Sequence, residues 1–203
     1  MRILLVTQYF YPEVFKSNDL AFELARRGHH VDALVGIPNY PEGKYFKGYG
    51  LFSKRHEVID CSDGNRKGKV NVYRCFQTPR GKGGWRLPVN YFSYVISGCL
   101  WVLFFIAWRK KYDCIIGHEP SPIFQAYPAL LLRKLRKIPF YYWIMDLWPD
   151  AMKSGGGVKN EKLLNFIDKL VKGIYRQTDK ILITSKRFRE PIAQKGDFKD
   201  KMT

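Results

Sequence analysis

The sequence predicts an α/β domain with a doubly wound, mostly parallel sheet and helices on both faces. Two observations carry this prediction. Apolar runs typical of strands alternate with amphipathic helical stretches along the 203 residues, and this alternation favours a parallel sheet. Polar and aromatic clusters also stand directly after several of these strands. In a parallel sheet such loops share one edge, where ligands bind.

The first elements form a β-α-β unit. A strand at 2–7 leads through an aromatic loop to a helix that begins near Ser17 or Asn18, either of which would serve as the N-cap. Gly28 can end this helix. A second strand at 30–35 follows, and the unit therefore starts a parallel sheet.

The later elements continue the alternation. Residues 36–69 are mostly loop with a short strand around 57–59, and residues 77–87 form a glycine- and lysine-rich connection. We expect further strands at 70–76, 113–117, 138–144 and 180–184, and helices at 121–137, 160–178 and 185–195.

Two glycine clusters lack the patterns of nucleotide-binding loops. The run at 81–84 has no G-x-G-x-x-G spacing, and no helix is predicted immediately after it. The run at 155–157 precedes no Lys-Ser or Lys-Thr pair. We predict a flexible loop at both, and the second could be a flap beside a site.

The segment from Leu87 to Trp108 has no charged residue and is long enough to cross a bilayer. A crossing there would place the two halves of one sheet on opposite sides of the membrane. We therefore favour a core helix. The alternative is a helix in the membrane interface, with Tyr91, Trp101 and Trp108 at headgroup level.

The net charge of +17 implies an anionic partner or surface, because Lys and Arg outnumber Asp and Glu by 35 to 18. A solvated basic surface without a partner is the simpler alternative. The basic residues are dispersed along the chain, which argues against nucleic acid. The four cysteines have no metal-ligand spacing and are interpreted as small buried side chains in a reducing compartment.

The most specific local signal is His118-Glu119-Pro120-Ser121-Pro122. Ser121 fits an N-cap and Pro122 fits the first helical position. The loop would then bring His118 and Glu119 to the start of a helix, a location that favours anions. An imidazole there could bind a sugar hydroxyl or a phosphate; a structural surface histidine is the alternative.

Two further loops combine aromatic and polar residues. Asp146-Leu147-Trp148-Pro149-Asp150 suits a sugar, whose C–H face stacks on a ring while its hydroxyls bond to carboxylates. A turn with Trp148 in the core is an equal alternative. Pro38-Asn39-Tyr40-Pro41-Glu42-Gly43-Lys44 is similar, and Lys44 could meet a phosphate. A rigid proline-rich loop is its alternative.

These loops together resemble a known family. Gln8-Tyr9-Phe10-Tyr11-Pro12-Glu13, Asn18-Asp19-Leu20, Pro38 to Gly43 and Asp146 to Asp150 are similar in order and spacing to the amino-terminal, Rossmann-like half of retaining family-4-type GT-B glycosyltransferases. Bacterial fucosaminyl and colanic-acid-type transferases of surface-polysaccharide synthesis, which serve lipopolysaccharide or capsule, resemble it most. His118-Glu119-Pro120 resembles the histidine loop of related mannosyltransferases, which lies against the donor sugar.

The resemblance implies that residues 1–203 are a single acceptor-side domain and that the carboxyl-terminal donor-binding domain is absent. The glutamate pair eight positions apart, which that second half usually carries, is not found in this sequence. Where many members have paired glycines after the first strand, this chain has Val14-Phe15-Lys16-Ser17, which puts donor contacts there in doubt. We expect the isolated domain to be inactive.

The resemblance also implies transfer of a sugar from a nucleotide-sugar donor to a polyprenyl-diphosphate-linked acceptor, with the enzyme peripheral on the cytoplasmic face of an anionic membrane. We predict His118 and Glu119 as catalytic residues, and no metal or cofactor. The predicted substrate-binding residues are Asn18, Asn39, Tyr40, Lys44, Asp146 and Trp148. The alternative functions are a basic nucleic-acid-binding module and a membrane-surface module without catalysis.

Overall fold

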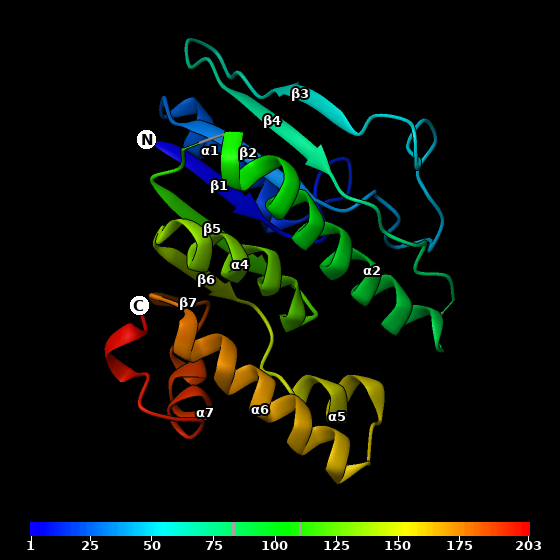
Figure 1. Ribbon diagram of the computed structural model, residues 1–203, viewed down its shortest axis with the longest axis vertical. Coiled ribbons are helices and arrows are strands. Elements are labelled where there is room, and N and C mark those ends of the chain that lie inside the picture. Colours follow the sequence, from blue (N-terminus) through cyan, green and yellow to red (C-terminus); the bar gives the residue numbers. More distant parts are fainter. Residues whose placement is uncertain (83, 110) are drawn as a thin grey trace.

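A computed structural model describes residues 1–82, 84–109 and 111–203 of the chain. Within this part, seven strands form one sheet in the order β3-β4-β2-β1-β5-β6-β7 (Figure 1). All neighbouring strands are parallel except β3 and β4. The predicted α/β fold is confirmed. The strands are β1 (Arg2–Val6), β2 (His30–Val35), β3 (His56–Asp60), β4 (Lys69–Arg74), β5 (Cys114–Glu119), β6 (Phe140–Ile144) and β7 (Lys180–Ile183).

Helices cover both faces of this sheet (Figure 1). Successive side chains of a strand point to opposite faces, and β1 shows the result. Leu5 packs with Ala21 of α1 on one side, whereas Leu4 belongs to the core shared with α2 and α4 on the other. The helices are α1 (Lys16–Arg26), α2 (Arg86–Trp101), α3 (Ala107–Arg109), α4 (Tyr127–Arg136), α5 (Asp150–Gly156), α6 (Glu161–Gln177) and α7 (Arg189–Ala193). A π-helix spans Val102–Ile106, and short 3-10 helices span Ile123–Ala126, Lys186–Phe188 and Lys199–Lys201.

The order of the strands places the switch point of the sheet between β1 and β5. From β1 the chain runs outward to β2 and the edge strand β3, and β4 then fills the place between them. It next crosses to β5 on the other side of β1 and runs outward to β7. Ligands of open α/β sheets bind outside the carboxyl ends of the strands at such a point. The loops after β1, β2, β5 and β6 all meet this edge.

The start of α1 differs from the prediction. Phe15 is the N-cap residue, and Ser17 and Asn18 lie buried in the first turn. Their side chains bond to the preceding loop instead: Ser17 donates to the Tyr9 carbonyl at 3.3 Å. Gly28 ends the helix as predicted, since its φ of 85° is one that glycine adopts without steric cost.

The glycine run at 155–157 is not the flexible loop that we predicted. Gly155 and Gly156 are the last residues of α5, and Gly157 closes that helix with a left-handed φ of 61°. Of the other run, Gly83 lies outside the described residues. α2 begins at Arg86, close behind it, although the sequence predicted no helix immediately after the run.

The apolar segment at 87–108 is one continuous helical run formed by α2, the π-helix and α3. One face is buried, and Gly98 permits a close approach there, because a Cβ on it would lie 2.8 Å from Pro128 Cγ. The opposite face is exposed, and only 28% of the most apolar window is buried. The core-helix interpretation therefore holds for one face only, because the neighbouring elements lie on a single side.

The exposed face of this run carries large apolar side chains at helical spacing, and we call it the α2 stripe. By length and composition the run Arg86–Ile106 could cross a membrane. Both of its ends join strands of the same sheet, so a crossing would divide the fold. The α2 stripe consists of Trp85 (73% exposed), Val89, Phe92, Ile96, Leu100, Phe104 and Trp108 (67% exposed).

Candidate functional site

His118 and Glu119 lie at the end of β5 and not in the loop that we predicted. β5 continues through Gly117 to Glu119. A Cβ on Gly117 would lie 2.6 Å from the ring of Tyr142, so the glycine makes room for that ring. The helix consequently starts later than predicted. Ser121 has a φ of 121° and is no N-cap, and the N-cap of the 3-10 turn is Pro122.

The His118 imidazole is buried, with 1% of the residue exposed. Its ring meets Trp143 of β6 edge-on, with 4.9 Å between the ring centroids. Neither ring nitrogen has a hydrogen-bond partner among the described residues. Burial lowers the pKa of His118 to about 4, so the ring is neutral at neutral pH and keeps one unused donor and one unused acceptor.

Glu119 joins β5 to the loop after β6. Its Oε2 accepts hydrogen bonds from the backbone N–H groups of Met145 at 3.3 Å and Asp146 at 3.2 Å. The residue is fully buried, and burial raises the pKa of Glu119 well above its usual range. Glu119 therefore positions the loop after β6 through its buried carboxyl group.

Glu13 joins the loops after β1 and β2 in the same way. Its Oε2 accepts from the N–H of Phe10 at 3.1 Å, and its Oε1 accepts from Asn39 at 2.8 Å and Tyr40 at 2.7 Å. Burial raises the pKa of Glu13 to about 7. We did not predict Glu13 as a site residue, although it ends the motif that follows the first strand.

Asn39 and Asn18 use their side chains to hold backbone in place. Asn39 Oδ1 accepts from the N–H of Arg80 at 2.9 Å and from Asn90 Nδ2 at 3.4 Å. Asn18 Nδ2 donates to the carbonyl of Glu13, and its Oδ1 accepts from a neighbouring N–H. Both predicted substrate-binding residues are buried and shape the loops in this structure.

Aromatic rings and a guanidinium group gather around the loop after β1. The Tyr9 ring stacks on Phe15 with 5.1 Å between centroids and lies 5.7 Å from Tyr40. Arg80 Nη1 donates to the Tyr9 hydroxyl at 3.1 Å, and the guanidinium lies 5.2 Å from the Tyr40 ring centroid. Arg80 lacked any sequence signal, since it lies in the glycine- and lysine-rich connection.

Tyr91 of α2 connects this cluster to the loops after β5 and β6. Its hydroxyl interacts with Tyr9 and Ser121, and burial together with the Asp146 carboxylate raises the pKa of Tyr91. The structure therefore brings the predicted residues Tyr40 and Asp146 into one neighbourhood. We call Tyr9, Tyr40, Arg80, Tyr91 and Asp146 the carboxyl-edge site.

The remaining two predicted residues, Trp148 and Lys44, are placed away from these loop contacts. Trp148 is 6% exposed and meets Phe124 edge-on at 5.5 Å between centroids. It fills core, as the alternative interpretation of its loop expected. Lys44 is exposed and lines a cavity of about 390 Å³ with Glu42, Gly43, Gly81, Lys82, Trp85 and Arg86.

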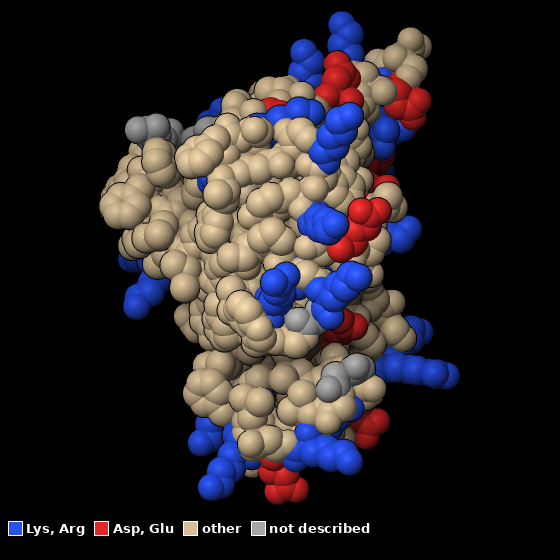
Figure 2. Space-filling model, turned by 90° about the vertical axis from the view of Figure 1, so that its right-hand side faces the viewer, with Lys and Arg blue, Asp and Glu red and all other residues tan. Residues whose placement is uncertain are grey.

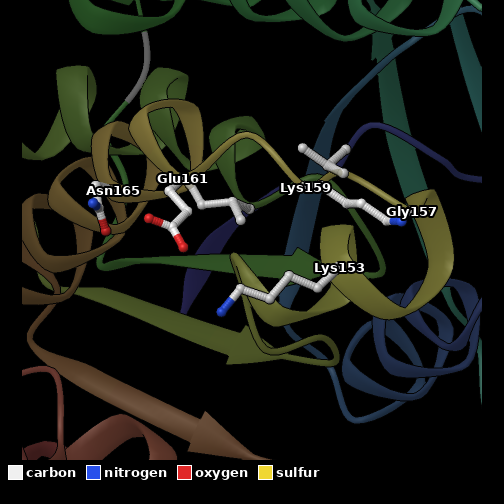
Figure 3. A pocket seen from close by; sticks show the side chains of 7 residues that line it. Lys153, Gly157, Lys159, Glu161 and Asn165 are labelled. Atoms are coloured by element: carbon white, nitrogen blue, oxygen red, sulfur yellow. The ribbon is translucent and has the colours of Figure 1, made fainter.

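A second cavity of about 490 Å³ lies between α5 and α6 (Figure 3). Lys153 of α5, Lys159 of the connection and Glu161 at the start of α6 line it (Figure 3). None of the predicted site residues lines it. Among the described residues, no group of three His, Cys, Asp or Glu side chains could hold a metal ion.

The strand order and the cluster of polar loops at the switch point are those of a ligand-binding α/β domain. Comparison with known proteins gives the class. Residues 17–203 match the model of the Glycosyl transferase 4-like domain, so the chain belongs to that family and is a glycosyltransferase module. No curated protein matches the chain significantly.

Solved glycosyltransferase structures share the fold. The chain is similar to sucrose-phosphate synthase from Thermosynechococcus elongatus, with a TM-score of 0.57 and 12% identity over 95% of this chain and 44% of that one. It is also similar to the calicheamicin glycosyltransferase CalG4, with a TM-score of 0.52 and 14% identity over 100% of this chain and 51% of that one. The chain thus spans about half the length of these structures.

Proposed function

We propose that this chain is the acceptor-side domain of a retaining glycosyltransferase that moves a sugar from a nucleotide-sugar donor to a polyprenyl-diphosphate-linked acceptor. The observation that carries the proposal is the convergence of four strand-exit loops at the switch point, held together by Glu13 and Glu119. Donor binding is assigned mainly to a second Rossmann-like domain. Bacterial surface-polysaccharide synthesis, of the fucosaminyl or colanic-acid type, is the proposed setting.

The carboxyl-edge site has the chemistry of a carbohydrate acceptor site. Tyr40 is 39% exposed and offers a ring for the C–H face of a sugar. Asp146 adds a carboxylate for hydroxyl groups, and the Arg80 guanidinium lies over the Tyr40 ring, 5.2 Å from its centroid. An apolar face beside a few fixed polar groups is typical of a small-molecule site.

The proposed reaction needs no protein nucleophile. The acceptor hydroxyl oxygen bonds to the anomeric carbon, the bond from that carbon to the diphosphate breaks, and the diphosphate takes the hydroxyl proton on the same face. The protein contributes positioning and electrostatic stabilisation. The neutral His118 ring is proposed to bind the transferred sugar. Only 1% of His118 is exposed in this structure, so that contact requires a rearrangement that opens the ring to the substrate.

The α2 stripe supports a membrane-bound acceptor. Large exposed apolar patches mark interaction surfaces, and an apolar helix face flanked by basic residues suits an anionic membrane interface. Figure 2 shows a broad uncharged surface on its left side, which is the front of Figure 1 where α2 lies. Arg86 precedes the segment and Arg109-Lys110-Lys111 follow it, and each such residue contributes about 1 kcal/mol near an anionic leaflet.

The reaction is tested on the complete enzyme with a panel of nucleotide sugars and a polyprenyl-diphosphate-linked glycan. We expect transfer with retained anomeric configuration, read from the product by NMR. An inverted product, or transfer only to acceptors without a lipid diphosphate, would contradict the proposal.

The membrane surface is tested by flotation of this chain with vesicles that contain phosphatidylglycerol. Replacing Ile96 and Phe104 by Ser should weaken binding at least about tenfold, because each side chain loses apolar burial in the interface. Phe52→Ser with Phe166→Ser, at exposed apolar positions outside the stripe, is the matched control and should leave binding unchanged. Equal losses in both pairs, or binding of oligonucleotides in place of vesicles, would contradict a membrane role.

A further inference from the structure

We propose that the cavity lined by Lys44, Lys82 and Arg86 binds the diphosphate of the lipid-linked acceptor. This inference rests on the proposed function and deepens it, since it assigns a site to one chemical group of the substrate. The cavity measures about 390 Å³, within the range of small-molecule sites. We call it the Lys44–Arg86 cavity.

Charge is the first argument. Three cationic side chains line the cavity against a single carboxylate, that of Glu42. Across the described part of the chain, none of the three forms an ion pair with a carboxylate. Each phosphate of a lipid-linked diphosphate is negatively charged, and charge-assisted hydrogen bonds from Lys and Arg to phosphate are the strong kind.

The backbone around the cavity brings the cations together. The N–H of Gly81 donates to the carbonyl of Gly43 at 3.0 Å. A Cβ on Gly43 would lie 2.3 Å from the Gly81 carbonyl oxygen, so only glycine permits this approach. Both glycines have positive φ values, 74° and 63°. The loop after β2 and the segment before α2 therefore meet at this point, and Lys44 and Lys82, the residues that follow the two glycines, line one cavity.

The location of the cavity distinguishes a lipid-linked diphosphate from a free anion. On one side, the chain continues from Gly81 back to Arg80, which contacts Tyr9 and Tyr40 in the carboxyl-edge site. On the other side, Trp85 lines the cavity and also begins the α2 stripe. Along the surface, the polar and aromatic carboxyl-edge site is therefore followed by the cationic cavity and then by the apolar α2 stripe. This order matches the glycan, the diphosphate and the lipid of the acceptor.

The cavity between α5 and α6 provides a contrast. It is larger and also contains two lysines, Lys153 and Lys159. No residue of the α2 stripe lines it, and neither does any residue of the carboxyl-edge site. Both cavities therefore contain lysines and have room for a small anion, whereas only the Lys44–Arg86 cavity is continuous with the α2 stripe.

Titration calorimetry measures the binding of a soluble short-chain prenyl diphosphate to this chain. We expect the double variant Lys44→Gln with Lys82→Gln to weaken binding by about tenfold or more, since two charge-assisted contacts are lost. The matched control, Lys153→Gln with Lys159→Gln, removes the same charge at the other cavity and should change binding less than about twofold. Unchanged thermal unfolding shows that both variants fold.

Further ligands separate the sources of the anion. Inorganic diphosphate should bind more weakly than the prenyl diphosphate and lose affinity in the same variant, and the prenyl alcohol should be insensitive to the lysines. Equal weakening in both variants would overturn the assignment. So would loss of binding to phosphatidylglycerol vesicles with unchanged prenyl diphosphate binding, because the cations would then serve lipid headgroups.

Kinetics of the complete enzyme separate this inference from the proposed function. The Lys44→Gln/Lys82→Gln variant should raise the KM for the lipid-linked acceptor and leave the KM for the donor unchanged. Transfer to that acceptor with an unchanged acceptor KM would overturn the cavity assignment while the function stands. No transfer to any lipid diphosphate in the wild-type enzyme would instead overturn the function.

Discussion

Two buried glutamates occupy similar positions at neighbouring parts of the same sheet edge, and they differ in how completely they are bonded. Glu13 uses both carboxyl oxygens and accepts three backbone hydrogen bonds. Glu119 uses only Oε2, and its Oε1 has no partner among the described residues. The Glu13 carboxyl is therefore satisfied by the chain itself, whereas the Glu119 carboxyl is only partly satisfied.

Glu119 follows directly after His118, whose two ring nitrogens lack partners in the described part of the chain. Buried polar groups are nearly always hydrogen-bonded, and each exception needs an explanation. We interpret the difference between the residues as a division of roles: Glu13 fixes the loops, and His118 with Glu119 Oε1 keeps polar capacity for a ligand. The predictions below test this division, beginning with the largest effect.

Replacing His118 by Leu should lower sugar transfer by the complete enzyme by about 100-fold or more, the cost of losing one preorganised polar group at a reacting centre. The free energy of unfolding should stay the same or rise, because the change removes buried polar atoms that lack partners. Initial rates and urea unfolding measure the two effects. A destabilised variant with normal transfer would assign His118 to the fold.

Replacing Glu13 by Ala should lower the free energy of unfolding by about 3 kcal/mol, since three backbone N–H groups lose their acceptor in a buried place. Glu119→Ala should cost less, about 1 kcal/mol, because only the Asp146 N–H loses its acceptor. The Met145 N–H keeps the Glu119 carbonyl, which lies 3.1 Å away. Denaturant unfolding of the two variants shows which one loses more free energy of unfolding. A larger loss in Glu119→Ala would reverse the comparison.

The pH dependence of stability should reveal Glu13. Its folded pKa is about 7, above the value of 4.5 for an unperturbed glutamate. Between these values the unfolded chain has released a proton that the folded chain still binds, so the contribution of Glu13 to stability should fall as pH rises from about 4.5 to about 7. His118 contributes the opposite slope, because its folded pKa of about 4 lies below the ordinary value of 6.5. Glu13→Gln should remove the Glu13 part of the slope. Parallel pH profiles for wild type and variant would show that Glu13 does not titrate in this range.

Much of the fold could be predicted from the sequence because local patterns and tertiary packing agree there. The first β-α-β unit, the end of α1 at Gly28 and the late strand at 180–183 follow from periodicity and helix-end residues. The strand expected at 113–117 continues to Glu119, and Gly117 admits the Tyr142 ring within it. The α2 stripe was hidden because a uniformly apolar segment gives no sign of which face is covered.

The candidate site was predictable only in part for a related reason. Tyr40 and Asp146 stood out because they follow strands that share an edge. Arg80 and Tyr91 reach the same place from a glycine-rich connection and an apolar helix, and only the folded chain shows this. The side chain of Asn39 holds loop backbone and that of Trp148 packs in the core, and neither placement could be read from the motifs alone.

The central claim is that the carboxyl-edge site receives the acceptor, and photo-crosslinking tests it most directly. The complete enzyme would be irradiated with a lipid-linked acceptor analogue that carries a photoreactive group on its first sugar, and the labelled peptides identified by mass spectrometry. The account predicts label within 9–15, 39–44, 80–91 and 145–150, and competition by the natural acceptor. Competed label confined to α6, α7 or the amino-terminal edge of the sheet would contradict it.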